Sequence, residues 1–349
     1  MRPAAPTRAP TAVAVAIVAV LGLAGCFDDA APPAGPGPSA HPTAPAGPEI
    51  GAWHGLVYDD RLGATVLVNG GPERVVPPDR RLELWSWDGT AWRLLNADGP
   101  SVRNFAAVAY DQVRDVVVVH GGITPGGDPL AETWEWDGAR WQRFDAAALG
   151  GREGSVMTYD PVRELVLLYG GAVGAEVRAD TWSWDGRSWQ LESRQGPPAR
   201  FADYLVFDEA RQDVVLYGGH VITETGPPAI ADTWLWDGRR WREADAESAP
   251  GPRVNARAVF DAGTRRVLMV GGGNADNETR SDVWAWDGSG WTRLAERALP
   301  PRQGHGLAYD RKRGVVVLTG GLDRPGTGAR HQDVWEWSGT SFAQVYPAG

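Results

Sequence analysis

Residues 180–189 read DTWSWDGRSW, a stretch with three tryptophans in ten positions. The phrase recurs in four further copies and one altered copy, DVWEWSGTSF, whose last residues are Trp92, Trp141, Trp241, Trp291 and Phe342. Together with Trp53, these copies account for all 18 tryptophans of the chain. A binding site is usually built once, so six copies of one phrase indicate that the tryptophans serve the architecture of a repeat fold.

The phrase reads as two short strands joined by a hairpin. Residues two apart in a strand share a face, so Trp182 and Trp184 project together. The Asp-Gly that follows favours a tight turn, because both residues tolerate positive φ. A two-residue loop would set Trp189 opposite Trp182, and a four-residue loop would set it opposite Trp184. Either register puts three indoles on one face, which only packing against a neighbouring sheet can bury.

Glycine pairs divide the chain into units of about 50 residues, and they begin at Gly70, Gly121, Gly170, Gly218, Gly271 and Gly320. Each unit reads as four strands: one ending in aromatic-Asp, a β-branched run into the glycine pair, the Trp-x-Trp strand, and one that starts at the last tryptophan. These motifs resemble the kelch family over residues 51–346. The resemblance implies an all-β, six-bladed kelch-type β-propeller with four antiparallel strands per blade. WD-repeat propellers are the nearest rival, but their period is shorter, at about 40–45 residues.

The first residues resemble a bacterial lipoprotein signal. Arg2 and Arg8 precede an apolar run, and LAGC at 23–26 matches a lipobox. The resemblance implies that residues 1–25 are a signal peptide and that Cys26 carries lipid. The alternative, an uncleaved membrane helix, needs roughly 20 apolar residues, more than this run provides. Residues 26–50, rich in Pro, Ala and Gly, are expected to form a tether, which predicts a lipid-anchored protein of the cell envelope on its periplasmic or extracellular face.

Composition excludes several functions. The formal net charge is −10 and no basic run is present, which argues against nucleic acid and anionic lipid headgroups as partners. We therefore expect contact with the bilayer through the Cys26 lipid only. Because Cys26 is the single cysteine, the mature chain is expected to have no disulfide and no thiolate nucleophile. A monomer without a cofactor is the expectation.

Binding is expected where the repeats differ most, in the segments after the glycine pairs: Pro72–Leu82, Ile123–Ala131, Ala172–Ala179, His220–Ala231, Gly273–Ser281 and Leu322–Gln332. In propellers these loops gather on one face beside the central channel, and loops on a rigid frame commonly carry binding. The alternative is that these loops simply tolerate insertion.

Five blades open with an arginine, and these candidate ligand-binding residues are Arg103, Arg152, Arg200, Arg253 and Arg302. A ring of guanidinium groups would suit an anionic ligand. The structural alternative, an ion pair with a neighbouring acid, is favoured because binding sites seldom need repeat symmetry. Glu153 beside Arg152 is the best candidate acid–base pair.

Two histidines, His54 and His305, occupy equivalent places in the first and sixth units, and Asp203 holds the same place in the fourth. We regard all three as candidate ligand-binding residues at the channel. A metal site needs three or four convergent ligands. Two neighbouring histidines and one distant acid are too few, so no metal is predicted.

Two functions remain open. The favoured one is a non-catalytic module that binds a protein or glycan in the envelope. The alternative is a sugar-active, mutarotase-like enzyme that uses the mouth of the central channel. Kelch relatives include galactose oxidase and sialic-acid mutarotase, and the oxidase chemistry needs a tyrosine–cysteine crosslink for which this sequence has no free cysteine. Fold alone does not assign function, so catalysis stays uncertain, with binding preferred.

Overall fold

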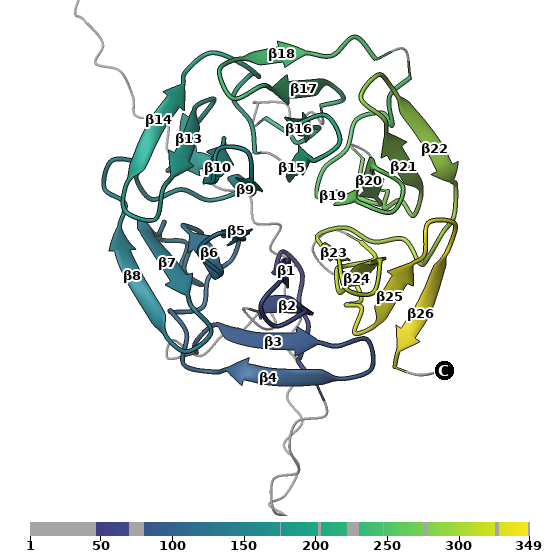
Figure 1. The fold of residues 1–349 in the computed structure, drawn as a ribbon, viewed down its shortest axis with the longest axis horizontal. Helices are drawn as coiled ribbons and strands as arrows, with labels where there is room; N and C mark the ends of the chain where they lie inside the picture. Colours follow the sequence, from purple (N-terminus) through teal and green to yellow (C-terminus); the bar gives the residue numbers. More distant parts are fainter. Residues whose placement is uncertain are drawn as a thin grey trace, which may run out of the picture. The chain divides into compact units, whose positions relative to one another are not determined.

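A computed structural model describes residues 47–69, 80–174, 176–201, 204–221, 230–246, 248–274, 278–324 and 328–347. These residues form six four-stranded antiparallel sheets around a central axis (Figure 1). The fold is a six-bladed β-propeller, as the sequence predicts. No helix among the described residues is long and apolar enough to cross a membrane.

The strands of the first three blades follow the repeats. Blade one holds β1 (Gly55–Asp59), β2 (Ala64–Asn69), β3 (Glu83–Trp87) and β4 (Trp92–Asn96). Blade two holds β5 (Ala107–Asp111), β6 (Val116–His120), β7 (Glu132–Trp136) and β8 (Trp141–Asp145). Blade three holds β9 (Val156–Asp160), β10 (Leu165–Tyr169), β13 (Thr181–Trp184) and β14 (Trp189–Ser193), with a separate hairpin of β11 (Ala172–Val173) and β12 (Glu176–Val177) in its loop.

The last three blades repeat the pattern. Blade four holds β15 (Tyr204–Asp208), β16 (Asp213–Tyr217), β17 (Thr233–Trp236) and β18 (Trp241–Glu243). Blade five holds β19 (Arg257–Asp261), β20 (Arg266–Val270), β21 (Val283–Trp286) and β22 (Trp291–Ala295). Blade six holds β23 (Gly306–Asp310), β24 (Val315–Thr319), β25 (Val334–Trp337) and β26 (Phe342–Tyr346). The first strand of every blade lies innermost and the fourth lies outermost (Figure 1).

The tryptophan hairpin adopts the four-residue loop of the two registers that the sequence allows. Trp184 on β13 pairs directly with Trp189 on β14. Asp185 closes the loop, because one of its carboxylate oxygens accepts the backbone N–H groups of Arg187 and Ser188, each at 2.8 Å. The equivalent aspartates in the hairpins of blades one, two, four and five accept the same pair of bonds.

The indoles of one blade are buried by the blade before it. Trp184 is fully buried and Trp189 is 7% exposed, and both pack on apolar residues of blade two such as Val118. The Trp189 indole N–H donates to the Thr133 hydroxyl at 2.8 Å. The same bond joins Trp241 to Thr181 at 2.7 Å and Trp291 to Thr233 at 3.0 Å. The tryptophans therefore pack and hydrogen-bond between neighbouring blades, as the repeats predict.

The sixth copy of the hairpin has phenylalanine in place of the last tryptophan, and this change matches the residue that it contacts in blade five. Blade five carries Val283 where blades two to four carry threonine, so it offers no hydroxyl to an indole. Blade six meets that position with Phe342, which needs no acceptor, and the two side chains belong to one apolar cluster. The change from tryptophan to phenylalanine is thus complementary to its neighbour.

A second contact crosses the seams at the Asp-Gly hairpin. Gly186 has φ 88°, and a Cβ there would lie 2.6 Å from a guanidinium nitrogen of Arg114 in the preceding blade. Arg114 is held in place by Asp111 at 2.8 Å. At the closing seam Gly89 faces Arg313 of blade six in the same way. Glycine is needed here both for its backbone conformation and for this close approach.

The ring closes by packing between blades one and six. Residues 47–54 form no strand. Ile50, which the sequence assigns to the tether, is 1% exposed and packs with Trp87 and Val317. The Gln332 side chain donates to the Ile50 carbonyl oxygen at 2.6 Å and accepts its N–H at 2.8 Å.

We predict that Thr181→Val lowers the free energy of unfolding by about 1–3 kcal/mol, because it leaves the buried Trp241 indole N–H without an acceptor. Adding Trp241→Phe should recover part of that loss, since the pair then matches Val283 and Phe342. Urea denaturation of residues 27–349 checks this as a double-mutant cycle. Strictly additive effects of the two substitutions would contradict the coupling.

Candidate functional site

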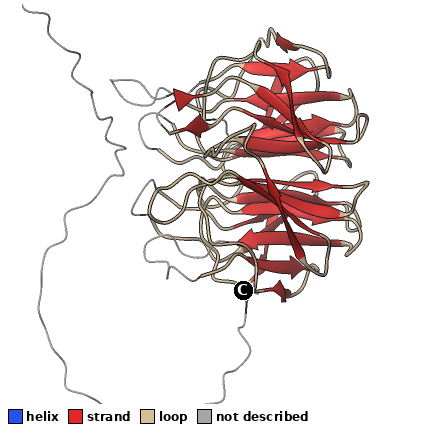
Figure 2. Ribbon diagram, turned by 90° about the vertical axis from the view of Figure 1, so that its left-hand side faces the viewer, coloured by secondary structure: helices blue, strands red, loops and turns tan. Residues whose placement is uncertain are grey.

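The candidate site is the mouth of the central channel on the loop face. Residues directly after the blade-opening arginines form β-bridges with residues directly after the glycine pairs, as in Asn104 with Ile123, Glu153 with Ala172, and Gln303 with Leu322. The blade entries and the variable loops therefore lie on the same face. Figure 2 shows the longer loops together on one side of the ring, at the left.

The residue two positions after each blade-opening position, which is Gly51 in blade one and arginine in the other blades, has an unusual backbone. Its φ is 56° at Trp53, 57° at Phe105, 62° at Gly154, 57° at Asn255 and 63° at Gly304. We call these five residues the collar; the blade-four position, Ala202, lies outside the described residues. Left-handed φ values cost roughly 1–3 kcal/mol at non-glycine residues and cluster at functional sites. Three of the five collar residues bear this strain.

The collar is continuous from blade five through blades six and one to blade three. The Gly304 N–H donates to the Asn255 carbonyl at 2.9 Å, and the Trp53 N–H donates to the Gly304 carbonyl at 2.7 Å. The rings of Trp53 and Phe105 lie 5.2 Å apart. The Gly154 N–H then donates to the Phe105 carbonyl at 3.0 Å. These bonds fix the backbone of the collar from blade to blade.

Aromatic and amide groups dominate the collar surroundings. The Trp53 indole N–H donates to the Asn255 side-chain oxygen at 3.3 Å, and the Asn255 amide donates to Gln303 at 3.0 Å. Phe201 stacks on His220 with ring centroids 5.1 Å apart. Trp53, Phe105, Phe201 and Asn104 are all half-buried, so each keeps surface for contact. Such a mixture suits a polar, uncharged ligand surface.

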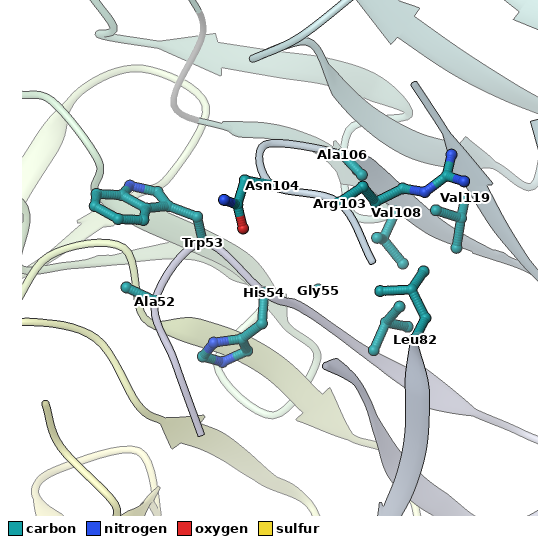
Figure 3. Close-up of a pocket in the computed structure, with 11 residues that line it drawn as sticks. Ala52, Trp53, His54, Gly55, Leu82, Arg103, Asn104, Ala106, Val108 and Val119 are labelled. Atoms are coloured by element: carbon teal, nitrogen blue, oxygen red, sulfur yellow. The ribbon is translucent and has the colours of Figure 1, made fainter. Parts of the chain in front are cut away.

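A small cavity lies beneath the collar between blades one and two. Its volume is about 10 Å³, room for one water-sized molecule. Figure 3 shows the Trp53 indole and the Asn104 amide on one side of it, while the Arg103 guanidinium points away from both. The cavity is too small for a ligand, so binding would take place on the collar above it.

The five arginines lie inside their own blades. Their side chains are 0–2% exposed, and each pairs with an acid that precedes the Trp-x-Trp strand. Arg253 shows the geometry: its two terminal nitrogens each reach Asp282 at 2.6 Å, and one also donates to the Gly271 carbonyl at 2.9 Å. Although burial alone would raise it, the bonds from Arg253 hold the pKa of Asp282 below its usual value. This arrangement is the one that the structural interpretation expects.

The two histidines fill the seam between blades six and one. His54 is 7% exposed, and burial, followed by the charge of Arg257, lowers its pKa to about 4. His305 is fully buried, and burial, followed by Arg302, Arg257 and His54, lowers its pKa well below the usual value. Within the described ranges no group of three or more His, Cys, Asp or Glu side chains suits a metal. Asp203 lies outside the described residues.

Glu153 differs from the arginines and from His54 and His305 because it is only half-buried. It is half-buried at the channel mouth, and burial raises the pKa of its carboxyl group. In the described part of the chain it forms no ion pair, and the neighbouring Arg152 is occupied by Asp180 at 2.8 Å. Glu153 is thus a single carboxyl group without an assembled catalytic partner among these residues.

Sequence reasoning missed the collar and the amide and aromatic side chains beside it. The available signal was the position two residues after the blade-opening arginine (Gly51 in blade one), where the six units read Trp, Phe, Gly, Ala, Asn and Gly. A position that varies beside one that repeats is typical of a surface residue that the repeated packing does not constrain.

Fold and site together define a six-bladed β-propeller with a strained aromatic collar at its channel mouth. No family model and no curated protein matched the sequence. Among solved structures, the chain is similar to the structure of YjhT, with a TM-score of 0.67 and 12% sequence identity over 86% of this chain and 99% of that one. At this identity the likeness supports the fold alone.

We predict that stability falls as pH is lowered from about 6.5 to 4. The unfolded chain protonates His54 near the ordinary pKa of 6.5, whereas the folded chain keeps it neutral down to about 4. The unfolded state therefore binds the proton first, and His54 alone should reduce the free energy of unfolding by ~1.4 kcal/mol per pH unit in this window.

Denaturant titrations at several pH values measure this slope. His54→Gln should make the slope shallower between pH 6.5 and 4 while leaving the pH dependence above 7 unchanged. An identical slope in the variant would show that His54 is not the residue responsible.

Proposed function

We propose that the protein is a lipid-anchored, kelch-type propeller that binds a protein or glycan ligand in the bacterial cell envelope without catalysis. The kelch-like motifs and the lipobox at 23–26 support the family and the anchor. Cys26 and the residues between it and Gly47 lie outside the described residues, so the anchor is proposed from the sequence.

The composition of the channel mouth is the observation that supports binding. Among the described residues, its half-buried groups include the aromatic rings of Trp53, Phe105 and Phe201, the amide of Asn104 and the carboxyl group of Glu153. The ionisable groups beneath them are buried and uncharged, as at His54, or tied into ion pairs, as at the five arginines. A rigid surface of aromatic and amide groups recognises shape and hydrogen bonds, and the described residues of this surface form no acid–base pair.

Glu153 is the residue that supports the alternative function, a sugar-active enzyme. A carboxyl group with a raised pKa at a channel mouth has the property that a general acid needs. Mutarotation, however, requires a second group that accepts the proton. Arg152, its neighbour, is 1% exposed and already paired. Binding is therefore the better supported of the two functions.

We predict that purified residues 27–349 capture a specific envelope protein or glycan through the collar face. The double variant Asn104→Ala, Phe201→Ala should weaken capture at least tenfold, because it removes one aromatic and one amide contact. Val113→Ala, on an exposed hairpin between β5 and β6, serves as the control and should leave capture unchanged. Glycan arrays and pulldowns from envelope extracts distinguish the two ligand classes.

The same protein is assayed for interconversion of sugar anomers. Turnover that is lost in Glu153→Gln would overturn the non-catalytic proposal. Equal capture by the double variant and the wild type would move the binding site away from the collar.

We predict that Cys26→Ser in the full chain shifts the protein from the membrane fraction to the soluble fraction, because the lipid is the only expected anchor. Mass spectrometry of the mature N-terminus should show a lipidated Cys26 in the wild type. A membrane-bound Cys26→Ser variant, or an unmodified Cys26, would contradict the anchor.

A further inference from the structure

A groove of about 540 Å³ lies between blades one and two, and three indoles line it. They are Trp134, Trp136 and Trp141, the complete tryptophan set of blade two. We call this the blade-two groove. At the same hairpin position, Trp92, Trp189, Trp241 and Trp291 are 2–9% exposed, whereas Trp141 is only half-buried. In this groove Trp141, one of the tryptophans that pack between blades, therefore reaches the surface.

Two sequence differences distinguish the polar contacts of this seam. Blade one has Leu84 where blades two to four have the threonine acceptor, so the Trp141 indole N–H donates instead to Asn96 on the outermost strand, at 3.1 Å. Blade two has Glu132 where blades three to six have aspartate, and this carboxylate pairs with Arg103. The Trp134 indole N–H has no hydrogen-bond partner among the described residues, whereas Glu83 at the same position of blade one accepts the Trp85 indole N–H at 2.9 Å.

The polar lining of the groove is mainly cationic. Arg81 is exposed and forms no ion pair with any described residue, and Arg140 has an 80% exposed side chain whose nearest acid is Asp137 at 3.5 Å. Asp98 and Asn96 add a carboxylate and an amide to the lining. Asp137 partly offsets the charge of Arg140, so Arg81 is the guanidinium group at this groove that favours an anionic occupant.

These groups fit one class of ligand. The C–H face of a pyranose ring is apolar and stacks on the electron-rich face of an indole, while its hydroxyl groups need paired donors and acceptors such as Asn96 and Asp98. A carboxylate on the sugar would form a bidentate contact with a guanidinium group. A volume of about 540 Å³ lies in the usual range of ligand sites.

We propose that the blade-two groove binds an acidic saccharide. One hexuronate ring stacks on Trp141, and its carboxylate is held by Arg81. The site lies at the outer strands of blades one and two, away from the collar, so the proposal does not depend on the function assigned to the channel mouth.

Isothermal titration of residues 27–349 with trigalacturonic acid, and with its carboxyl-reduced neutral counterpart, tests the proposal. The acidic trisaccharide should bind at least tenfold more tightly than the reduced one. Trp141→Phe should weaken binding at least fivefold, since it removes stacking area while keeping an aromatic ring in the seam. Arg81→Gln should abolish the preference for the acidic form.

Matched controls are available in blade three. Trp189→Phe changes the equivalent but buried tryptophan, and Arg187→Gln removes an exposed hairpin charge far from the groove; both should bind like the wild type. The collar variant Asn104→Ala, Phe201→Ala should also bind like the wild type, which separates this site from the proposed function. Thermal melting verifies that every variant is folded.

Absence of binding at millimolar trigalacturonic acid would overturn the proposal. So would equal affinity for the reduced trisaccharide, or an equal loss of affinity in Trp141→Phe and Trp189→Phe.

Discussion

The burial of one blade's indoles by the preceding blade is the contact on which the fold depends. A four-stranded sheet cannot bury Trp184 and Trp189 by itself, so each blade is stable only beside a neighbour. The threonine hydroxyl that receives the indole N–H gives this contact a direction around the ring. The last seam has no shared strand, and the insertion of Ile50 between blades one and six, clamped by Gln332, replaces it.

The same framework explains why the channel mouth is rigid. Each blade-opening arginine ties the entry segment to the glycine pair and to the acid of its own blade, as Arg152 does with Gly170 and Asp180. The next residues are therefore held where the entry segments converge, and the chain turns there through left-handed φ values. Strain at Trp53 and Phe105 persists because both neighbouring blades fix the segment. The repeated scaffold thus positions side chains that are not themselves repeated.

The sequence predicts the parts of this structure that repeat. Blade number, strand order and the shared face of the three indoles follow from the recurrence of the phrase at 180–189. The hairpin register stays open in the sequence because Asp-Gly suits both loop lengths, and the Asp185 side chain decides it by binding two backbone N–H groups. The collar is not predictable in this way, since positive φ at Trp53 follows from contacts with Gly304, about 250 residues away.

Three seams depart from the repeat: those on both sides of blade six, where Val283 and Val334 stand in place of threonine, and the one between blades one and two. Between blades one and two, Leu84 replaces the threonine acceptor, and the Trp141 indole N–H donates to Asn96 instead. The half-buried rings of Trp53 and Phe105 contact each other at the inner end of the same seam. Apolar contacts such as Val119 with Val66 still hold the two blades together, so this seam does not depend on the missing threonine–indole bond. Loss of the threonine alone does not expose an indole, because Trp92 packs with Val334 at the closing seam and is only 8% exposed. The half-buried Trp141 therefore reflects the whole environment of its seam, including its bond to Asn96.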